Sequence, residues 1–322
     1  MLTEARAICD ALGNVAGLFA VLRGICNFSI IDGNRDRAEE TARQCLKIAE
    51  ETGEIEHLIE AHCPLGYALW MKGDFAAARL HLDRAVSLYR QHDGARLAFP
   101  TPQDPLIVCL SVLPLLLDAL GDDAGARRAA DDLVAHGKAL GLAFELANAY
   151  TWHAWYDVFS ERYALAAEYS QIAIDICQEH SYPTYEVTAC VPYFAANGRI
   201  SNTKDAIVFA ENLMRKIDNI GILHLTGSAL GEMAALQSLD GNHQAALSSV
   251  ELGLRRTVAS GDLQMLSPLH RRRGEILEAH FGPGCDDAVA AYKEALAIGE
   301  DQRAPGLVEK ARARLAAAAA GA

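Results

Sequence analysis

The sequence lacks the short motifs that usually mark a catalytic or metal site. It contains no G-x-x-x-x-G-K-[S/T] loop to cradle a triphosphate, no H-E-x-x-H pair and no serine in a G-x-S-x-G context. None of its eight cysteines forms a C-x-x-C pair, and no Cys/His spacing matches a zinc site. We therefore predict a protein that is not an enzyme, with no catalytic residue, no metal site and no cofactor.

The chain is also poor in proline and in long apolar runs. Its 10 prolines fall mainly between periodic segments, while alanine and leucine dominate, a composition that favours helices. The longest apolar run, from Leu106 to Leu117, contains Ser111 and Pro114. It predicts a buried helix that is interrupted at the proline and is too short to span a bilayer. The N-terminus lacks the pattern of a secretory signal, so we expect no contact with a membrane.

An excess of basic residues is absent as well. The formal net charge is −13, which argues against a nucleic-acid partner because such surfaces require a basic patch. The only basic triplet, Arg271–Arg273, predicts the solvated face of a helix, with a phosphate or partner contact as the minority alternative. Most cysteines lie among apolar residues, as buried free thiols do, so we expect a reducing, cytoplasmic location.

What the sequence does contain is a repeat. A small residue opens one helical face at nearly constant intervals of 40, 48, 40, 40, 40 and 42 residues. These positions are Ala38, Ala78, Ala126, Ala166, Ala206, Ala246 and Ala288. Self-similarity at a fixed period of this size is typical of solenoids built from repeated helix pairs.

The clearest unit surrounds the dipeptide Gly73–Asp74, which predicts a turn whose aspartate caps the following helix. After it, Ala78, Leu82 and Ala85 fall on one helical face at spacings of four and three residues. Before it, Gly66 lies inside an apolar helix, where glycine costs about 1 kcal/mol relative to alanine. These small residues predict that neighbouring helices pass very close to one another.

Together these positions resemble a tetratricopeptide repeat, whose first helix carries Leu–Gly and whose second helix carries this alanine spacing. The resemblance implies an all-α fold, a right-handed superhelical solenoid of about seven helix pairs with terminal capping helices. A helix over Leu2–Leu12 is expected before the repeats, and a solvated cap over residues 305–320, fraying at Ala316–Ala320, is expected after them. The expected repeats cover residues 15–53, 59–91, 105–140, 146–180, 186–219, 226–260 and 266–300.

Two stretches resemble one bacterial group more narrowly: the insertion Gln91–Pro105 with the segment up to Gly121, and Leu269–Leu277. This group is the C-terminal tetratricopeptide region of multidomain signal-transduction ATPases, which an adenylate/guanylate cyclase domain or a winged-helix DNA-binding domain often precedes. The resemblance implies that the chain is the C-terminal piece of a longer protein, with an ordinary capping helix at its start as the alternative. In the insertion, Leu97 and Phe99 are expected to pack on a helix, and either a connector or a functional loop fits the sequence.

In such an array the first helix of each unit lines the concave side, where aromatic rings with a few polar groups are typical of a binding surface. The candidate binding residues, from the second to the fourth unit, are Tyr67, Trp70, Ser111, Asp118, Asn148, Thr151 and Trp155. The alternative is that Tyr67, Trp152 and Trp155 belong to the core between repeats.

The sequence thus favours a non-catalytic regulatory scaffold. It would bind a protein or peptide on its concave face, or contact an upstream ATPase or cyclase domain of the same parent. The alternative is a sensor that encloses a small-molecule effector in a groove containing Trp70 and Trp155.

Overall fold

The described part of the chain folds into helices. A computed structural model describes residues 4, 9, 11–99, 103–221 and 225–321, and these contain 15 α-helices, two short 3₁₀ helices and no strand. The predicted all-α class is confirmed. The helices are α2 (Val15–Asp32), α3 (Arg35–Thr52), α4 (Ile55–Met71), α5 (Phe75–Gln91), η1 (Gly94–Arg96), α6 (Pro105–Ala119), α7 (Asp123–Leu140), α8 (Ala143–Phe159), α9 (Tyr163–Glu179), α10 (Pro183–Ile200), α11 (Thr203–Ile220), α12 (Thr226–Leu239), α13 (His243–Ser260), η2 (Leu263–Met265), α14 (Leu266–Phe281), α15 (Asp286–Asp301) and α16 (Pro305–Gly321).

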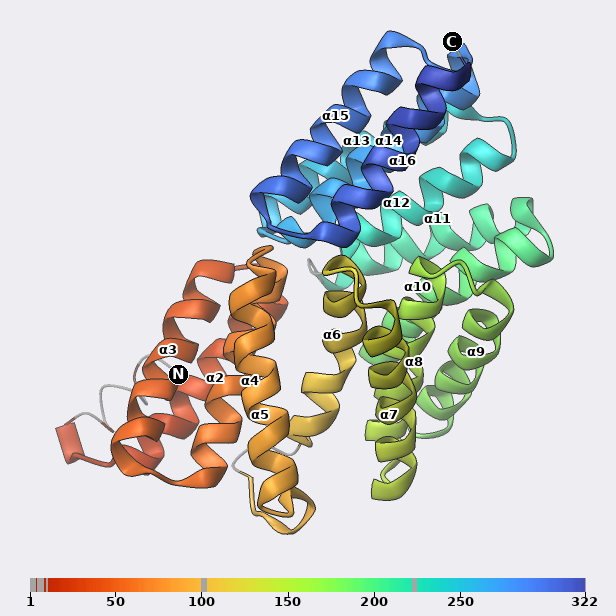
Figure 1. Cartoon of the computed structure of the whole chain (residues 1–322). Coiled ribbons are helices and arrows are strands. Elements are labelled where there is room, and N and C mark those ends of the chain that lie inside the picture. The colour runs from red at the N-terminus through yellow and green to blue at the C-terminus, as the bar shows by residue number, and fades with distance from the viewer. Residues whose placement is uncertain (1–3, 5–8, 10, 100–102, 222–224, 322) are drawn as a thin grey trace.

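Successive helices pack as pairs, and the pairs stack side by side into a curved solenoid (Figure 1). The pairs run from α2–α3 to α14–α15, and α16 follows the last pair. We call α2, α4, α6, α8, α10, α12 and α14 the first helices, and their partners the second helices. The helix expected over Leu2–Leu12 lies largely outside the described residues.

The turns within pairs follow from the residues that the sequence places there. Gly73 has a φ of 79°, in the left-handed region that glycine enters without strain. The Asp74 side chain accepts a hydrogen bond of 3.2 Å from the Ala77 amide and so caps α5, as predicted. Asparagine or aspartate caps α3, α7, α11 and α13 in the same way, so one local device recurs along the solenoid.

Small residues mark the helix contacts. All seven alanines of the repeat are buried, and from Ala38 in α3 to Ala246 in α13 each is the fourth residue of its second helix. Gly66 of α4 lies so close to α5 that an added Cβ would stand 2.7 Å from Leu82 Cγ. The alanines therefore occupy equivalent environments, as the repeat requires.

Three prolines lie inside helices. Pro64, Pro114 and Pro192 are buried within α4, α6 and α10. The interruption expected at Pro114 is wrong, because α6 continues to Ala119. Each proline removes one backbone hydrogen bond, and packing of the surrounding first helices outweighs that local cost.

The insertion after α5 is ordered by its apolar side chains. Leu97 and Phe99 pack against the main apolar core, and the Phe99 ring stacks on Tyr89 with ring centroids 5.9 Å apart. The contact predicted for these two residues is confirmed. Residues 100–102, between them and α6, lie outside the described part of the chain.

The C-terminal helices return to the N-terminal ones (Figure 1). Leu307 of α16 is buried in the same apolar cluster as α4 and α6 residues, and Lys310 Nζ lies 2.7 Å from Asp118 Oδ2 of α6. The solvated cap without a neighbour is therefore a wrong prediction. The helix also continues to Gly321, through the alanines expected to fray at Ala316–Ala320.

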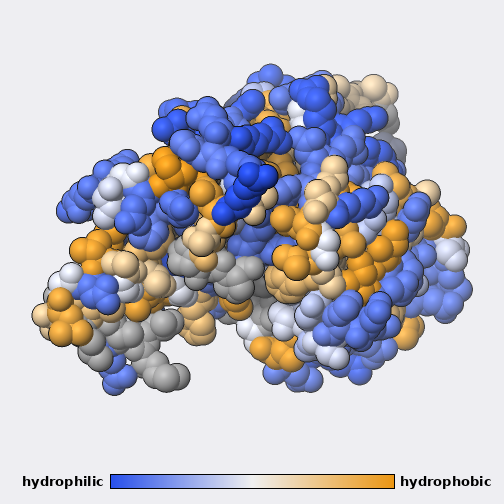
Figure 2. Space-filling view, turned by 90° about the horizontal axis from the view of Figure 1, so that it is seen from below, coloured by the Kyte–Doolittle hydropathy of each residue, from blue (hydrophilic) through white to orange (hydrophobic). Residues whose placement is uncertain are grey.

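Among the described residues, α2 is the one helix long and apolar enough to cross a membrane by length and composition. A core helix can meet the same criterion, and α2 carries Arg23 in a buried ion pair with Glu60. Its Phe28 and Ile31 side chains are exposed. On the face shown in Figure 2, hydrophilic side chains dominate the upper part, while hydrophobic ones gather toward the lower left and the right.

Candidate binding site

A pocket lies on the concave side, between the first helices of five consecutive pairs. Its volume is about 200 Å³. An apolar cavity of about 150 Å³ holds a benzene molecule, so this pocket suits one side chain or one small molecule. It is lined by Arg23, Asn27, Ile30 and Ile31 of α2, Pro64 and Tyr67 of α4, Gln103 of the insertion, Val108 and Ser111 of α6, Asn148 and Trp152 of α8, and Thr184, Tyr185 and Thr188 of α10.

Aromatic rings form one wall of the pocket. The rings of Tyr67 and Trp152 meet edge to face with centroids 6.3 Å apart. Trp70 packs behind both of them, at 5.6 Å from Tyr67 and 6.2 Å from Trp152. Edge-to-face pairs hold their rings in fixed orientations, so this wall is rigid before any ligand arrives.

The most informative polar group in the pocket is Asn148. Its side chain is only 2% exposed, yet no described residue donates a hydrogen bond to its Oδ1 atom. A buried acceptor left without a donor costs roughly 1–3 kcal/mol. A ligand that supplies an N–H or O–H group would recover that cost, whereas an apolar ligand would not.

Charges in the pocket cancel. Arg23 Nε donates a 2.7 Å hydrogen bond to Glu60 Oε2, and a second guanidinium nitrogen donates to Asn27 Oδ1. Burial acts to lower the pKa of Arg23, but the Glu60 carboxylate raises that pKa above its ordinary value, so the arginine stays charged. The pocket therefore presents polar atoms without a net charge, which favours an uncharged ligand group.

The structure brings three of the seven candidate residues to the pocket: Tyr67, Ser111 and Asn148. Trp70 supports the wall from behind. Thr151 and Trp155 are buried in the core, where Thr151 donates to the Ala147 carbonyl and Trp155 stacks on Phe159.

Asp118 lies outside the pocket, in the ion pair with α16. Trp152 lines the pocket and Trp155 does not, but Tyr67, Trp152 and Trp155 all belong to the buried apolar core, as the alternative expected.

Several of the lining residues were not predicted from the sequence. Those of α2 repeat at helical spacing, because Arg23, Asn27 and Ile31 are four residues apart on one face. That signal was present in the first unit, which the sequence-based groove did not include. The contribution of α10 near Tyr185 carried no comparable signal, since it depends on how far the array curves.

Histidine and cysteine form no metal centre in the described residues, where no group of three or more His, Cys, Asp or Glu side chains could hold an ion. The Nδ1 atoms of His62 and His81 lie 2.8 Å apart. Burial lowers the pKa of His62 to about 4, so the two rings share one hydrogen bond as neutral imidazoles at neutral pH. This hydrogen bond explains why the two Nδ1 atoms lie so close together, and no metal ion is needed to explain it.

Comparison with known proteins gave similarity at the level of structure and not of sequence. No family model matches the sequence, and no curated protein matches it. Among solved structures, the chain is similar to a tetratricopeptide repeat protein from Parabacteroides merdae, with 14% sequence identity and a TM-score of 0.48. The superposition covers 91% of this chain and 98% of that one.

Proposed function

We propose that the chain is a non-catalytic binding scaffold that holds a peptide segment of a partner protein on its concave face. The observation that supports this most is Asn148, a buried amide whose Oδ1 atom lacks a donor beside the rings of Tyr67 and Trp152. An extended peptide offers a backbone N–H next to a side chain, which is the combination that this amide and this aromatic wall would accept.

The pocket also indicates which peptide side chain fits. Its volume of about 200 Å³ suits a single side chain, and the Arg23–Glu60 pair leaves no net charge to attract an ionised one. Ile30 and Val108 add apolar side chains to the pocket lining. We therefore expect an uncharged, largely apolar peptide side chain at this position.

Selection of binders from a random peptide library against the whole chain tests the proposal. For a selected peptide, Asn148→Leu should weaken binding by about tenfold, because the peptide N–H loses its acceptor, which is about 1.4 kcal/mol. Trp152→Leu should weaken it further by removing the wall. Titration calorimetry of each variant gives the dissociation constants.

A matched control is Asn197→Leu, the same substitution on α10 outside the pocket, where the amide donates to the Tyr193 carbonyl. This variant should bind the selected peptide as the wild type does. Selected peptides that bind the Asn148→Leu and Trp152→Leu variants as tightly as the wild type would contradict the proposed site.

A small-molecule sensor is the second candidate, favoured by the small size of the pocket. A discrete uncharged molecule with one N–H or O–H donor would satisfy Asn148 as a peptide does. Tryptophan fluorescence separates the two candidates, since Trp152 lines the pocket and the Trp70 ring packs against the Trp152 ring. A saturable quench by one metabolite, without any peptide binder, would favour the sensor.

We further propose that the array is the regulatory arm of a larger cytoplasmic signalling protein with an ATPase or cyclase domain. The support is the resemblance of residues 91–121 and 269–277 to the C-terminal region of such proteins. In that setting the chain itself turns over no substrate. Assays of the isolated chain for ATP hydrolysis and cyclase activity check this, and robust turnover would refute it.

A further inference from the structure

The helix pairs α12–α13 and α14–α15, with η2 and α16, contact the N-terminal pairs along one interface, which we call the seam. On the N-terminal side, the seam involves the turns that follow α2, α4 and α6 (Figure 1). Arg35 Nε donates a 2.8 Å hydrogen bond to Asp262 Oδ1 across 227 positions of sequence, and both side chains are buried. Gln302 lies against Gly73 and donates a 2.8 Å hydrogen bond to the Leu263 carbonyl. With the Lys310–Asp118 pair, the seam touches three consecutive N-terminal turns.

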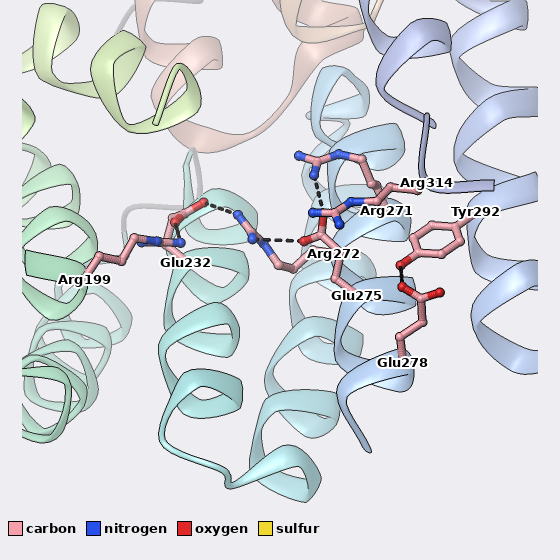
Figure 3. A network of polar contacts seen from close by, with 8 residues as sticks. All are labelled: Arg199, Glu232, Arg271, Arg272, Glu275, Glu278, Tyr292 and Arg314. Atoms are coloured by element: carbon pink, nitrogen blue, oxygen red, sulfur yellow. Dashed lines mark hydrogen bonds and ion pairs between the residues drawn. The ribbon is translucent and has the colours of Figure 1, made fainter. Parts of the chain in front are cut away.

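Helix α16 also reaches α10 through a chain of ion pairs (Figure 3). Arg314 Nη2 lies 2.8 Å from Glu275 Oε1, and Arg272 lies 3.0 Å from Glu275 and 3.3 Å from Glu232. Glu232 then pairs with Arg199 of α10 at 2.7 Å. Lys310 and Arg314 lie four residues apart on one face of α16, so this helix links α6, in the middle of the arc that surrounds the pocket, to α10 at one end of that arc.

The arginines of Arg271–Arg273 are therefore not the solvated face expected from the sequence, since each pairs with a carboxylate. Burial acts to lower the pKa of Arg272, but Glu232 raises it overall. Burial acts to raise the pKa of Glu232, but Arg199 and Arg272 lower it overall. Arg272 and Glu232 are thus both ionised at neutral pH, and their attraction holds the helices that carry them together.

The seam is connected to the pocket lining by direct contacts. The Ile30 carbonyl, in a residue that lines the pocket, accepts a hydrogen bond from Arg35. The Trp70 carbonyl accepts a 2.9 Å hydrogen bond from the Gly73 amide, and the Trp70 ring supports both pocket aromatics. Burial raises the pKa of the Tyr67 hydroxyl, and the nearby charges of Arg35 and Asp262 also act on it, which places Tyr67 close to the seam. A shift at the seam therefore moves pocket side chains.

A hollow that is open to solvent lies along the seam. This hollow of about 490 Å³ lies between Lys72–Asp74 on one side and Leu263 and Gln302 on the other. The C-terminal pairs also have an apolar cluster of their own, which includes Val250 and Leu269. The seam thus combines buried and partly exposed ion pairs with the buried Leu307, and interfaces with a large polar share allow the parts of a chain to move relative to one another.

We propose that the C-terminal helices clamp the curvature of the arc from α2 to α10 and thereby set whether the concave pocket takes its binding shape. The proposal rests on the proposed function in that the regulated site is the same pocket. With the seam closed, the five first helices hold Tyr67, Asn148 and Trp152 together. With the seam open, these helices spread apart and the pocket is lost. Coupling is reciprocal, so an occupied pocket favours the closed seam.

Hydrogen exchange of the whole chain, followed by mass spectrometry, tests the clamp without any ligand. The variant Gln302→Ala/Lys310→Ala removes two seam contacts at partly exposed side chains, the packing of Gln302 on Gly73 and the ion pair of Lys310 with Asp118. We expect amide exchange in the pocket segments of α4, α6 and α8 to become at least threefold faster. The matched control is Arg312→Ala on the same helix, because Arg312 pairs with Glu300 away from the seam.

Unchanged exchange in those segments, or an equal rise in Arg312→Ala, would overturn the proposal. The converse measurement uses Ser111→Val, which places a larger, apolar side chain in the pocket lining without touching the seam. It should slow exchange in residues 261–266 and 302–307 at least twofold, and unchanged or faster exchange there would contradict the coupling. Neither experiment requires a peptide, so a failed peptide selection would leave this result intact.

Discussion

At the scale of single residues, Gly66 shows how the contact of two helices depends on a missing side chain. A Cβ at this position would stand 2.7 Å from Leu82 Cγ and 3.1 Å from the Leu82 backbone nitrogen, which cannot move aside. We expect Gly66→Val to lower the free energy of unfolding by about 1–3 kcal/mol, as overpacked cores do. Urea denaturation gives the value.

The exposed Ala139→Val of α7 is the control for the added branched side chain, with an expected change within about 0.5 kcal/mol. Valine is a better helix former than glycine, so helix propensity cannot explain a loss in Gly66→Val; a loss no larger than that of Ala139→Val would contradict the close approach of α4 to α5.

At the scale of elements, rotation of a helix about its axis decides which side chains reach the pocket. The 3.6-residue period predicts the buried face of α8, but all its central residues from Ala147 to Val158 are buried. Such a helix carries no polar face that fixes its orientation, so Trp152 and Trp155 could not be told apart from the sequence. Asn148 could be placed on the pocket side because one repeat length of 40 residues gives it the same height along α8 as Val108 has along α6, and both residues line the pocket.

The insertion after α5 is held by an acidic cluster, and its anchoring should depend on pH. Asp104 accepts hydrogen bonds from Tyr89 Oη at 2.5 Å and, at 3.1 Å, from His136 Nε2, while its own amide donates to Glu145 Oε1 at 2.8 Å. Burial raises the pKa of Glu145 to about 7. The folded chain therefore binds this proton more tightly than the unfolded chain, whose glutamate titrates near pH 4.3, roughly.

Stability from this proton is fully present below about pH 4 and is lost as the pH rises to about 7. Between pH 5 and pH 8, Glu145 should lower the free energy of unfolding by on the order of 1–3 kcal/mol. In Glu145→Gln this loss should disappear, whereas the exposed Glu168→Gln should keep the wild-type pH profile. Urea denaturation at several pH values compares the three, and identical profiles would show that Glu145 is ionised without cost.

At the scale of the whole molecule, the repeated helix pairs and the contact of the C-terminal helices with the N-terminal ones have different origins. The interval of about 40 residues predicted the helix pairs and their contacts, because these depend on residues close in sequence. The return of α16 to α6 was not predicted, since it results from small rotations summed over all pairs. Asp118 and Lys310 carry no sequence signal that relates them, so a residue expected in the groove belongs to the seam.

The buried pair across the seam gives the sharpest test that the closed form exists in solution. Burial raises the pKa of Asp262, and Arg35 opposes this, so each charge depends on the other. Arg35→Met should lower the free energy of unfolding by about 3–5 kcal/mol, because it leaves a buried carboxylate alone. The double variant Arg35→Met/Asp262→Leu should recover more than half of that loss, since no buried charge remains.

The exposed pair of Arg90 with Asp132, at 2.9 Å, is the reference, and Arg90→Met should cost less than about 1 kcal/mol. If Arg35→Met costs no more than Arg90→Met, the two ends of the solenoid are apart in solution, because only a closed seam buries Asp262 against Arg35.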